Sequence, residues 1–342
     1  MSSNLTSSPQ KIILTTIVSQ FLKSSDHPIF NLQEDELIYE PLKGGGSAAT
    51  LYRFGWHDQF YVLRLFPTQS TSATRLHQIK LARLAGDFDL GPKILFVDSQ
   101  MNGMIMQFIP GRTVSEVDFT EPANIAAFAK FIKTMHSLEA DFPSAVSPFR
   151  RFDDFYVKMM KSPAILPARF LEVKILMGEL EELFQLWPVK NVPSHLDLHP
   201  LNIMLWENRF FLVDWVNGGM SDPYFDLATF CIFHGLNSTT EILFLSAYLG
   251  REPTKLEWHR FIVTQPIRLL VIAAALFSSN SDNSISYEKL LQDKSLPSWQ
   301  DFTKKGAIWP HSHLGACMFK TALALIDQEQ FQDSLHSLKN LT

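Results

Sequence analysis

The sequence predicts an α+β protein with a small β-rich N-terminal lobe and a larger, mostly helical C-terminal lobe. Strand-forming segments rich in aromatic and branched residues concentrate before residue 110, and apolar residues at helical spacing dominate from about residue 121. The chain has 342 residues, of which 46% are hydrophobic, so two lobes with sizeable cores are feasible. We therefore expect lobes over residues 1–110 and 111–342, with a hinge at Pro110–Gly111.

The N-terminal lobe is expected to begin with a helix, because Ser8 is a good N-cap and Pro9 suits the first helical position. A strand, a glycine cluster (KGGGSAA) and a hairpin should follow, then one helix and two short strands. In chain order these segments are strands at 37–42, 50–54 and 59–66, a helix at 71–86, and two strands within 93–109.

The C-terminal lobe shows the helical pattern at 124–140 and 171–187, and again from Phe225 onward. The exception is a short predicted hairpin, in which two apolar strands flank the turn residues Glu207 and Asn208.

Composition excludes several classes of function. The net charge is −5 and the pI is near 6.1, which argues against nucleic-acid and anionic-membrane partners. Cys231 and Cys317 are the only cysteines, too few for a disulfide framework, which favours a reducing compartment. The longest apolar run, 269–277, is about half of a membrane span. We expect a cytoplasmic protein without a membrane partner, and the oligomeric state is left open.

The segment SHLDLHPLNIML, residues 194–205, raises the central question about function. His195, Asp197 and His199 could ligate zinc from one side of an extended chain, or could be polar residues on a solvated loop. The third interpretation is the pattern H-x-D-x-x-x-x-N of a kinase catalytic loop, filled by His195, Asp197 and Asn202. This interpretation also accounts for Asp214, a second carboxylate across the predicted hairpin.

The blocks PSHLDLHPLNIML and FLVDWVNGGMSDPYFDLATF resemble the aminoglycoside phosphotransferase and choline/ethanolamine kinase superfamily. The resemblance covers most of residues 37–235, and its three motifs occur in the expected order. It implies a bilobal protein-kinase-like fold and transfer of the γ-phosphoryl group of ATP, with Mg²⁺, to a hydroxyl group of a small-molecule acceptor.

The resemblance also assigns roles near the reacting groups. Asp197 would accept the proton of the acceptor hydroxyl, and Asn202 and Asp214 would hold Mg²⁺. His195 would brace the catalytic loop, and Asp226 would be a buried carboxylate that accepts hydrogen bonds from loop N–H groups.

For the nucleotide, the resemblance implies that Arg64 grips phosphate oxygens and that backbone groups around Gln107 and Ile109 pair with adenine. In this superfamily the residue at the position of Arg64 usually pairs with a Glu on the following helix. Here Gln78 occupies the position of that Glu. We expect the phosphate loop to be formed by Gly44, Gly45, Gly46 and Ser47. The loop often has an asparagine in this superfamily, whereas Ala48 and Ala49 occupy the matching stretch here.

The acceptor is less well defined. A choline- or ethanolamine-type amino alcohol is favoured, although Val216 and Asn217 stand where choline kinases usually have Glu. Aminoglycoside-type antibiotics, thiamine-like alcohols and a non-catalytic nucleotide-binding protein are the alternatives. The residues considered for the acceptor pocket, by charge or by aromatic character, are Asp153, Asp154, Trp215, Tyr224, Trp258 and Trp309.

Overall fold

A computed structural model describes residues 9–24, 37–42, 49–56, 58–162, 164–279, 285–296 and 310–340. The predicted N-cap Ser8, the predicted phosphate loop at 44–47 and the acceptor candidate Trp309 lie outside these residues. The chain divides into two compact units. The first unit comprises Met1–Ser115, Asp141–Pro143 and His199–Gly218, and the second comprises Glu116–Ala140, Ser144–Leu198 and Gly219–Thr342.

The first unit contains a five-stranded antiparallel sheet in the order β1-β2-β3-β5-β4. Its strands are β1 (Tyr39–Pro41), β2 (Thr50–Trp56), β3 (Gln59–Leu65), β4 (Ile94–Val97) and β5 (Gly103–Gln107). Each strand lies within or overlaps a segment that the sequence predicts as extended, so this part of the prediction is confirmed.

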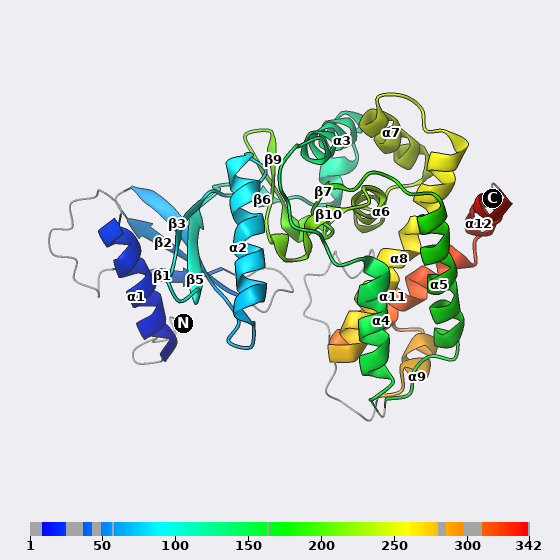
Figure 1. The fold of residues 1–342 in the computed structure, drawn as a ribbon, viewed down its shortest axis with the longest axis horizontal. Helices are drawn as coiled ribbons and strands as arrows, with labels where there is room; N and C mark the ends of the chain where they lie inside the picture. The colour runs from blue at the N-terminus through cyan, green and yellow to red at the C-terminus, as the bar shows by residue number, and fades with distance from the viewer. Residues whose placement is uncertain are drawn as a thin grey trace. The chain divides into compact units, whose positions relative to one another are not determined.

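Helix α1 (Pro9–Ser24) covers one face of this sheet, as Figure 1 shows at the blue end of the chain. Its buried residues recur at intervals of three and four, which gives the helix one apolar stripe. That stripe packs against Tyr61, Leu63 and Leu65, alternate residues of β3. The buried residues of the helix are Leu14, Ile17, Val18, Phe21 and Leu22.

Helix α2 (Ser72–Asp87) packs on the opposite face, where Ile79 meets Phe66 and Met104. The side chain of Thr71 accepts a hydrogen bond from the N–H of Thr74 at 3.2 Å, which caps the start of the helix. Because strand residues alternate between faces, Arg64 of β3 points to the side away from α1. This alternation sets the position of the candidate site.

The predicted hairpin at the end of the catalytic motif is confirmed. Strands β8 (Ile203–Trp206) and β9 (Arg209–Leu212) are joined by Glu207 and Asn208, which have φ angles of 47° and 60°, the geometry of a tight hairpin turn. Strand β6 (Arg112–Thr113) pairs with β8. A Cβ on Gly111 would lie 2.5 Å from the carbonyl oxygen of Leu205, so only glycine permits this close approach.

The predicted lobes and the compact units differ in three segments, 111–115, 141–143 and 199–218, of which the last is the longest. Residues 199–218 group with the first unit although they follow it by more than eighty residues in sequence. The predicted division into 1–110 and 111–342 therefore stays a proposal about folding domains.

The second unit is mostly helical, as predicted. Its two short strands, β7 (Val192–Ser194) and β10 (Gly219–Ser221), pair with each other. Its helices are α3 (Pro122–His136), α4 (Pro148–Met159), α5 (Phe170–Leu186), α6 (Tyr224–Phe233), α7 (Ser238–Leu249), α8 (Lys255–Ser279), α9 (Tyr287–Gln292), α11 (His311–Ile326) and α12 (Glu329–Asn340).

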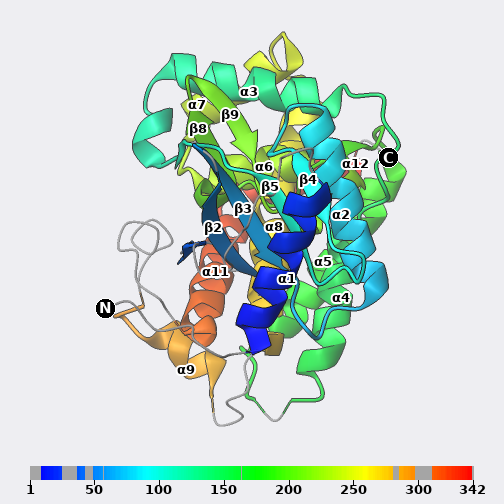
Figure 2. The same ribbon diagram turned by 90° about the vertical axis from the view of Figure 1, so that its left-hand side faces the viewer.

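Helix α8 is the central element of this unit and packs against α4, α6, α11 and α12 (Figure 2). Its 25 residues extend well beyond the apolar run 269–277, and by length and composition alone the helix could cross a membrane. However, 78% of its apolar window is buried inside the protein, which is typical of a core helix. Arg268, in the middle of this helix, is only 3% exposed.

Candidate active site

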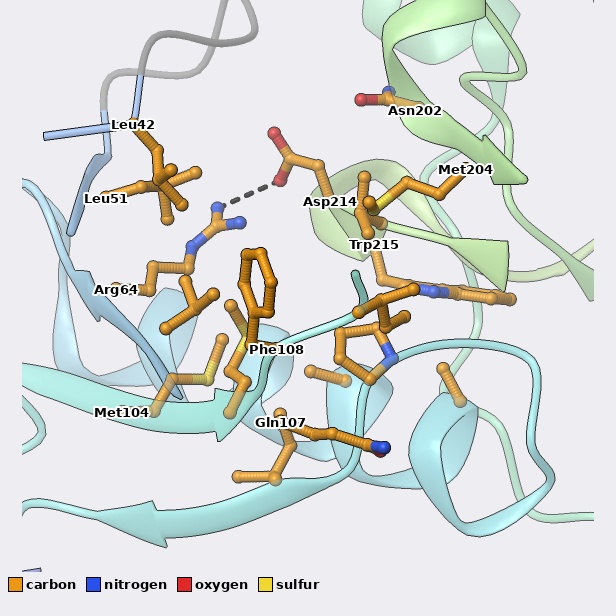
Figure 3. Close-up of a pocket in the computed structure, with 18 of the residues that line it drawn as sticks. Leu42, Leu51, Arg64, Met104, Gln107, Phe108, Asn202, Met204, Asp214 and Trp215 are labelled. Carbon is orange, nitrogen blue, oxygen red and sulfur yellow. Dashed lines mark hydrogen bonds and ion pairs between the residues drawn. The ribbon is translucent and has the colours of Figure 1, made fainter. Parts of the chain in front are cut away.

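A cavity of about 390 Å³ lies in the first unit, a size suited to a small molecule. Figure 3 shows Arg64, Met104 and Gln107 on the sheet side of this cavity and Asn202 and Asp214 on the side of the β8–β9 hairpin. Its apolar walls, which could enclose a flat ring, include Leu51, Val62, Ile94, Met104, Met106 and Met204.

Arg64 and Asp214 form an ion pair in this cavity. Nη2 of Arg64 lies 2.9 Å from Oδ1 of Asp214, and the two side chains are 9% and 16% exposed. A guanidinium group keeps its charge and can bind phosphate oxygens at two points. The predicted phosphate-binding cation and the predicted metal-binding carboxylate are thus already in contact.

The backbone holds Asp214 in an uncommon conformation. Its φ and ψ angles are 61° and 64°, the left-handed region that a residue with a Cβ rarely adopts. The 3₁₀ helix η4 (Trp215–Asn217) follows at once, and Nε1 of Trp215 donates to the carbonyl of Leu212 at 3.1 Å. Such conformations cost about 1–3 kcal/mol and persist where the surroundings enforce them, often at functional sites.

Asn202 is tied to the same segment. It ends the 3₁₀ helix η3 (Pro200–Asn202), and its carbonyl accepts a hydrogen bond from the N–H of Val213 at 3.0 Å. This bond places Asn202 next to the residue that precedes Asp214, and both side chains line the cavity. An amide oxygen and a carboxylate are hard ligands, which Mg²⁺ prefers together with phosphate oxygens and water. These two residues therefore fit a magnesium ion bound together with a nucleotide.

Gln78 of α2 also lines the cavity. Its Oε1 atom is buried and has no hydrogen-bond partner among the residues that the structure describes. The carboxylate that pairs with Arg64 thus comes from position 214, while α2 contributes an uncharged amide to the same cavity.

The backbone of Gln107, at the end of β5, and the backbone of Ile109 offer different hydrogen-bonding groups to a ligand. The N–H of Gln107 donates to the carbonyl of Lys93 at 2.9 Å, and its side chain is exposed. Ile109 is 5% exposed, and within the described part of the chain its N–H makes no hydrogen bond. Both residues line the cavity, so Ile109 offers a donor and Gln107 can offer only its carbonyl.

The second unit contains the loop with the predicted base. Asp226 of α6 is fully buried and accepts hydrogen bonds from the N–H groups of His195 at 2.8 Å and Leu196 at 2.6 Å. Leu196 has a φ angle of 61°, so the carboxylate holds a strained turn directly before Asp197. His136 adds a third contact through Nε2 at 3.1 Å.

The charge of Asp226 is stabilised by these partners. Burial alone would raise the pKa of its carboxyl group. The hydrogen bond from His136, the charges of His136 and His195 and the backbone N–H of His195 outweigh burial and hold the pKa below its ordinary value. Asp226 therefore stays ionised as the anchor of the loop.

The model of the phosphotransferase enzyme family matches residues 38–260, which include the cavity and the loop with Asp197. The chain belongs to the phosphotransferase enzyme family. The predicted membership is thereby confirmed, and so is the prediction of a small-molecule kinase.

Two curated relatives of this phosphotransferase carry related names. It is 26% identical to the LicA homolog of Mycoplasma capricolum over 195 residues, which are 57% of this chain and 76% of the relative. It is 27% identical to LicA of Haemophilus influenzae over 124 residues, which are 34% of this chain and 44% of the relative.

Solved structures confirm the kinase-like fold. A choline/ethanolamine kinase family protein of Mesorhizobium loti superposes with a TM-score of 0.70 and 20% identity, over 95% of this chain and 99% of that one. The choline kinase LicA of Streptococcus pneumoniae gives 0.66 and 17%, over 95% and 99%. A spectinomycin phosphotransferase gives 0.51 and 14%, over 83% and 93%.

The alternative of a zinc site is not supported. Among the residues that the structure describes, which include His195, Asp197 and His199, no group of three or more His, Cys, Asp or Glu side chains is placed to hold a metal ion. His195 is fully buried beside the anchor of the loop.

The acceptor candidates that the structure describes have partners within their own units. Asp153 forms an ion pair with Lys174 at 2.8 Å, and the exposed Asp154 forms one with Arg150 at 3.2 Å. Trp215 lines the cavity of the first unit, not the helical unit.

The two aromatic candidates of the helical unit have neighbours of their own. The ring of Tyr224, which is 7% exposed, lies 5.6 Å from the guanidinium of Arg260. The ring of Trp258 lies 5.7 Å from that of Phe261. These contacts are typical of core packing.

Sequence reasoning missed two arginines beside the predicted base. Nη2 of Arg268 in α8 lies 3.8 Å from Oδ1 of Asp197. Burial and the positive charge of Arg268 together lower the pKa of Arg151 in α4 to about 10, although the charge of Asp197 opposes the shift. A signal was present for Arg268, which is the only charged residue in the apolar stretch from Phe261 to Ser279.

Proposed function

We propose that this phosphotransferase transfers the γ-phosphoryl group of ATP to a hydroxyl group of a small molecule, with Mg²⁺ as cofactor. The observation that carries the proposal is the single cavity lined by Arg64, Asn202 and Asp214, with apolar walls for a base. The family supports a phosphotransferase, and nucleotide complexes are known for neighbours of this fold, with AMP in one case and ADP in another.

The nucleotide would lie with its adenine against the apolar wall of the cavity. The carbonyl of Gln107 would accept from the adenine amino group, and the N–H of Ile109 would donate to a ring nitrogen. Both groups line the cavity, which supports this assignment. Arg64 would bind phosphate oxygens, and the glycines at 44–46 with Ser47 stay proposed as the phosphate loop.

Asn202 and Asp214 would hold Mg²⁺, which supplies positive charge to offset the charge that develops on the phosphoryl oxygens. Arg64 already pairs with Asp214, and it would turn to phosphate oxygens as the nucleotide arrives. Each group then faces a ligand of opposite charge, so none of them is left unpaired in a largely buried cavity.

Asp197 would act as the general base that accepts the proton of the attacking hydroxyl. Its position depends on Asp226, because that carboxylate holds the backbone of His195 and Leu196. A positioned base of this kind contributes about 10²–10⁴-fold to the rate. His195 and Asp226 are positioning residues in this scheme.

The proposed acceptor is a small amino alcohol, of which ethanolamine and choline are simple examples. This class is supported by the solved choline and choline/ethanolamine kinases that share the fold. An aminoglycoside-type acceptor is the second candidate, supported by the spectinomycin phosphotransferase. We place the enzyme in the cytoplasm, where ATP is available, without nucleic-acid or membrane partners.

The test is acceptor-dependent release of ADP from MgATP, with ³¹P NMR to identify the phosphorylated product. The panel contains ethanolamine, choline, serine, thiamine and spectinomycin. ADP release that depends on one of these compounds supports the proposal. ATP binding without turnover on any of them, or on a wider set of metabolite alcohols, favours a non-catalytic nucleotide-binding protein.

A further inference from the structure

Arg268 is a buried cation with few partners. Its side chain is 4% exposed, and its one ion pair, with Asp197, is long at 3.8 Å. Its Nε atom is buried without an acceptor, and the described part of the chain provides no hydrogen bond to the group. A guanidinium group carries five N–H donors, and leaving them unsatisfied in the interior is costly. The group is therefore prepared for an acceptor that the protein does not supply.

The nearby carboxylates do not fill this role. Asp226 influences Arg268 through its charge, but its two oxygens already accept from His195, Leu196 and His136. Asp197 is the remaining carboxylate, and it is the group proposed to receive the proton of the acceptor.

A second cation strengthens the positive field at this place. Arg151 lies close enough to Arg268 and Asp197 for both charges to act on it. Two positive charges, those of Arg268 and Arg151, thus act near the carboxylate of Asp197. Like charges repel strongly where water is excluded, so a quaternary ammonium group is disfavoured beside them. An anionic group would be attracted and could accept paired hydrogen bonds.

We propose that the acceptor carries an acidic group, a carboxylate or a phosphate, close to the hydroxyl that is phosphorylated, and that Arg268 and Arg151 bind this group. The inference rests on the proposed function and narrows its acceptor class. An amino alcohol that suits the site carries an acidic group as well. Because Arg268 contacts Asp197, the acidic group and the reacting hydroxyl must be neighbours in the acceptor.

Matched pairs of acceptors test this without altering the protein. Serine is ethanolamine with an added carboxylate, and glycerol 3-phosphate is glycerol with an added phosphate. We expect kcat/KM to be about ten- to a hundredfold higher for the acidic member of at least one pair, the range for hydrogen bonds to charged groups. The pair that shows the effect distinguishes a carboxylate from a phosphate.

Variants identify the residues responsible. In Arg268→Gln and Arg151→Gln the preference for the acidic member should fall at least tenfold toward unity. The readout is the ratio of the two kcat/KM values within a pair, because a disturbance of Asp197 would change both values by the same factor. Arg150→Gln is the control, since Arg150 neighbours Arg151 in sequence but is 72% exposed. Its ratio should equal that of the wild type.

The outcomes separate this inference from the proposed function. If the neutral member of both pairs has a kcat/KM equal to or higher than that of its acidic counterpart, or if choline exceeds both acidic compounds, the inference is overturned and the kinase proposal stands. If no compound is phosphorylated, the proposed function fails for this panel, and thermal shifts with the same pairs decide the anion site. Stabilisation by serine or glycerol 3-phosphate alone supports it, and equal shifts overturn it. The wild-type comparison also decides if Arg268→Gln fails to fold.

Discussion

The guanidinium of Arg64 and the carboxylate of Asp214 are joined by an ion pair of 2.9 Å, although 150 residues separate them in sequence. The pair links strand β3 to the start of η4. In the proposed reaction each partner has another task, because Arg64 binds phosphate and Asp214 binds the metal. Binding of MgATP must therefore replace this contact by new ones.

A substitution at Gln78 should make it easier for MgATP to replace the contact between Arg64 and Asp214. We expect Gln78→Glu to place a second carboxylate in the cavity, which competes with Asp214 for Arg64. The Mg²⁺ concentration at half-maximal nucleotide binding should fall about two- to fivefold, the worth of a modest ion pair. Titration with Mg²⁺ at a constant concentration of a fluorescent ADP analogue measures this half-maximal concentration. An increased requirement for Mg²⁺ would contradict the competition.

Asp214→Asn should remove most of the benefit that Mg²⁺ gives to nucleotide binding. The substitution keeps the shape of the side chain but removes the charge that would bind the metal, and it removes the ion pair with the buried Arg64. Calorimetric titration of ADP with and without Mg²⁺ measures this benefit. The same Mg²⁺ dependence in the variant and the wild type would rule out the metal role.

Asp197→Asn should lower kcat about 10²–10⁴-fold and leave MgATP affinity nearly unchanged, because the base is lost while the nucleotide cavity is intact. Steady-state kinetics and ADP titration together measure both quantities. Asp154→Asn is the matched control, since that carboxylate is exposed. A variant at 197 that retains most of its turnover would refute the assignment of the base.

Gly91→Ala should weaken nucleotide binding and stability. A Cβ at this position would lie 2.6 Å from the carbonyl oxygen of Leu212, so the backbone before Asp214 must move. We expect a loss of about 1–3 kcal/mol in the free energy of unfolding. Gly178→Ala in helix α5 is the control, because nothing lies within 4 Å of its added methyl group. That variant should be as stable as the wild type or more stable.

Glu241 should make stability depend on pH. Burial raises the pKa of its carboxyl group from 4.5 to about 7, although a hydrogen bond from Gln265 opposes the shift. Because the folded-state pKa is the higher one, the stabilisation is complete below about pH 4.5 and is lost as the pH rises through 7. This loss is on the order of 3 kcal/mol.

Glu241→Gln keeps the shape and removes the titration. Urea unfolding at pH 5 and pH 8 should show that the variant gains stability relative to the wild type at the higher pH. An identical change with pH in both proteins would mean that Glu241 does not titrate in this range.

Features set by neighbouring residues could be predicted from the sequence. The aromatic and branched residues of 59–66 predict β3, the turn residues Glu207 and Asn208 predict the β8–β9 hairpin, and the helical spacing in 71–86 predicts α2. The ordered motifs predict the family from the sequence alone. In each case the chemistry that decides the structure lies within a few residues.

Features set by distant contacts could not be predicted in the same way. The grouping of residues 199–218 with the first unit depends on glycine contacts such as that of Gly111 with Leu205. The place of Arg268 beside Asp197 depends on how α8 packs in the second unit. The roles of the aromatic acceptor candidates stay a prediction, because an aromatic residue type alone does not distinguish a binding surface from core packing, as the buried Tyr224 illustrates.

The hairpin that joins the first unit has a consequence for biosynthesis. Residues up to Ser115 leave the ribosome long before His199–Gly218 is translated, yet the nucleotide cavity needs both. Residues up to Ser115 therefore lack one wall of the cavity while about eighty further residues are synthesised. A nascent chain released before position 214 would lack Asp214, the proposed magnesium ligand, and would be a natural substrate for chaperones or proteases.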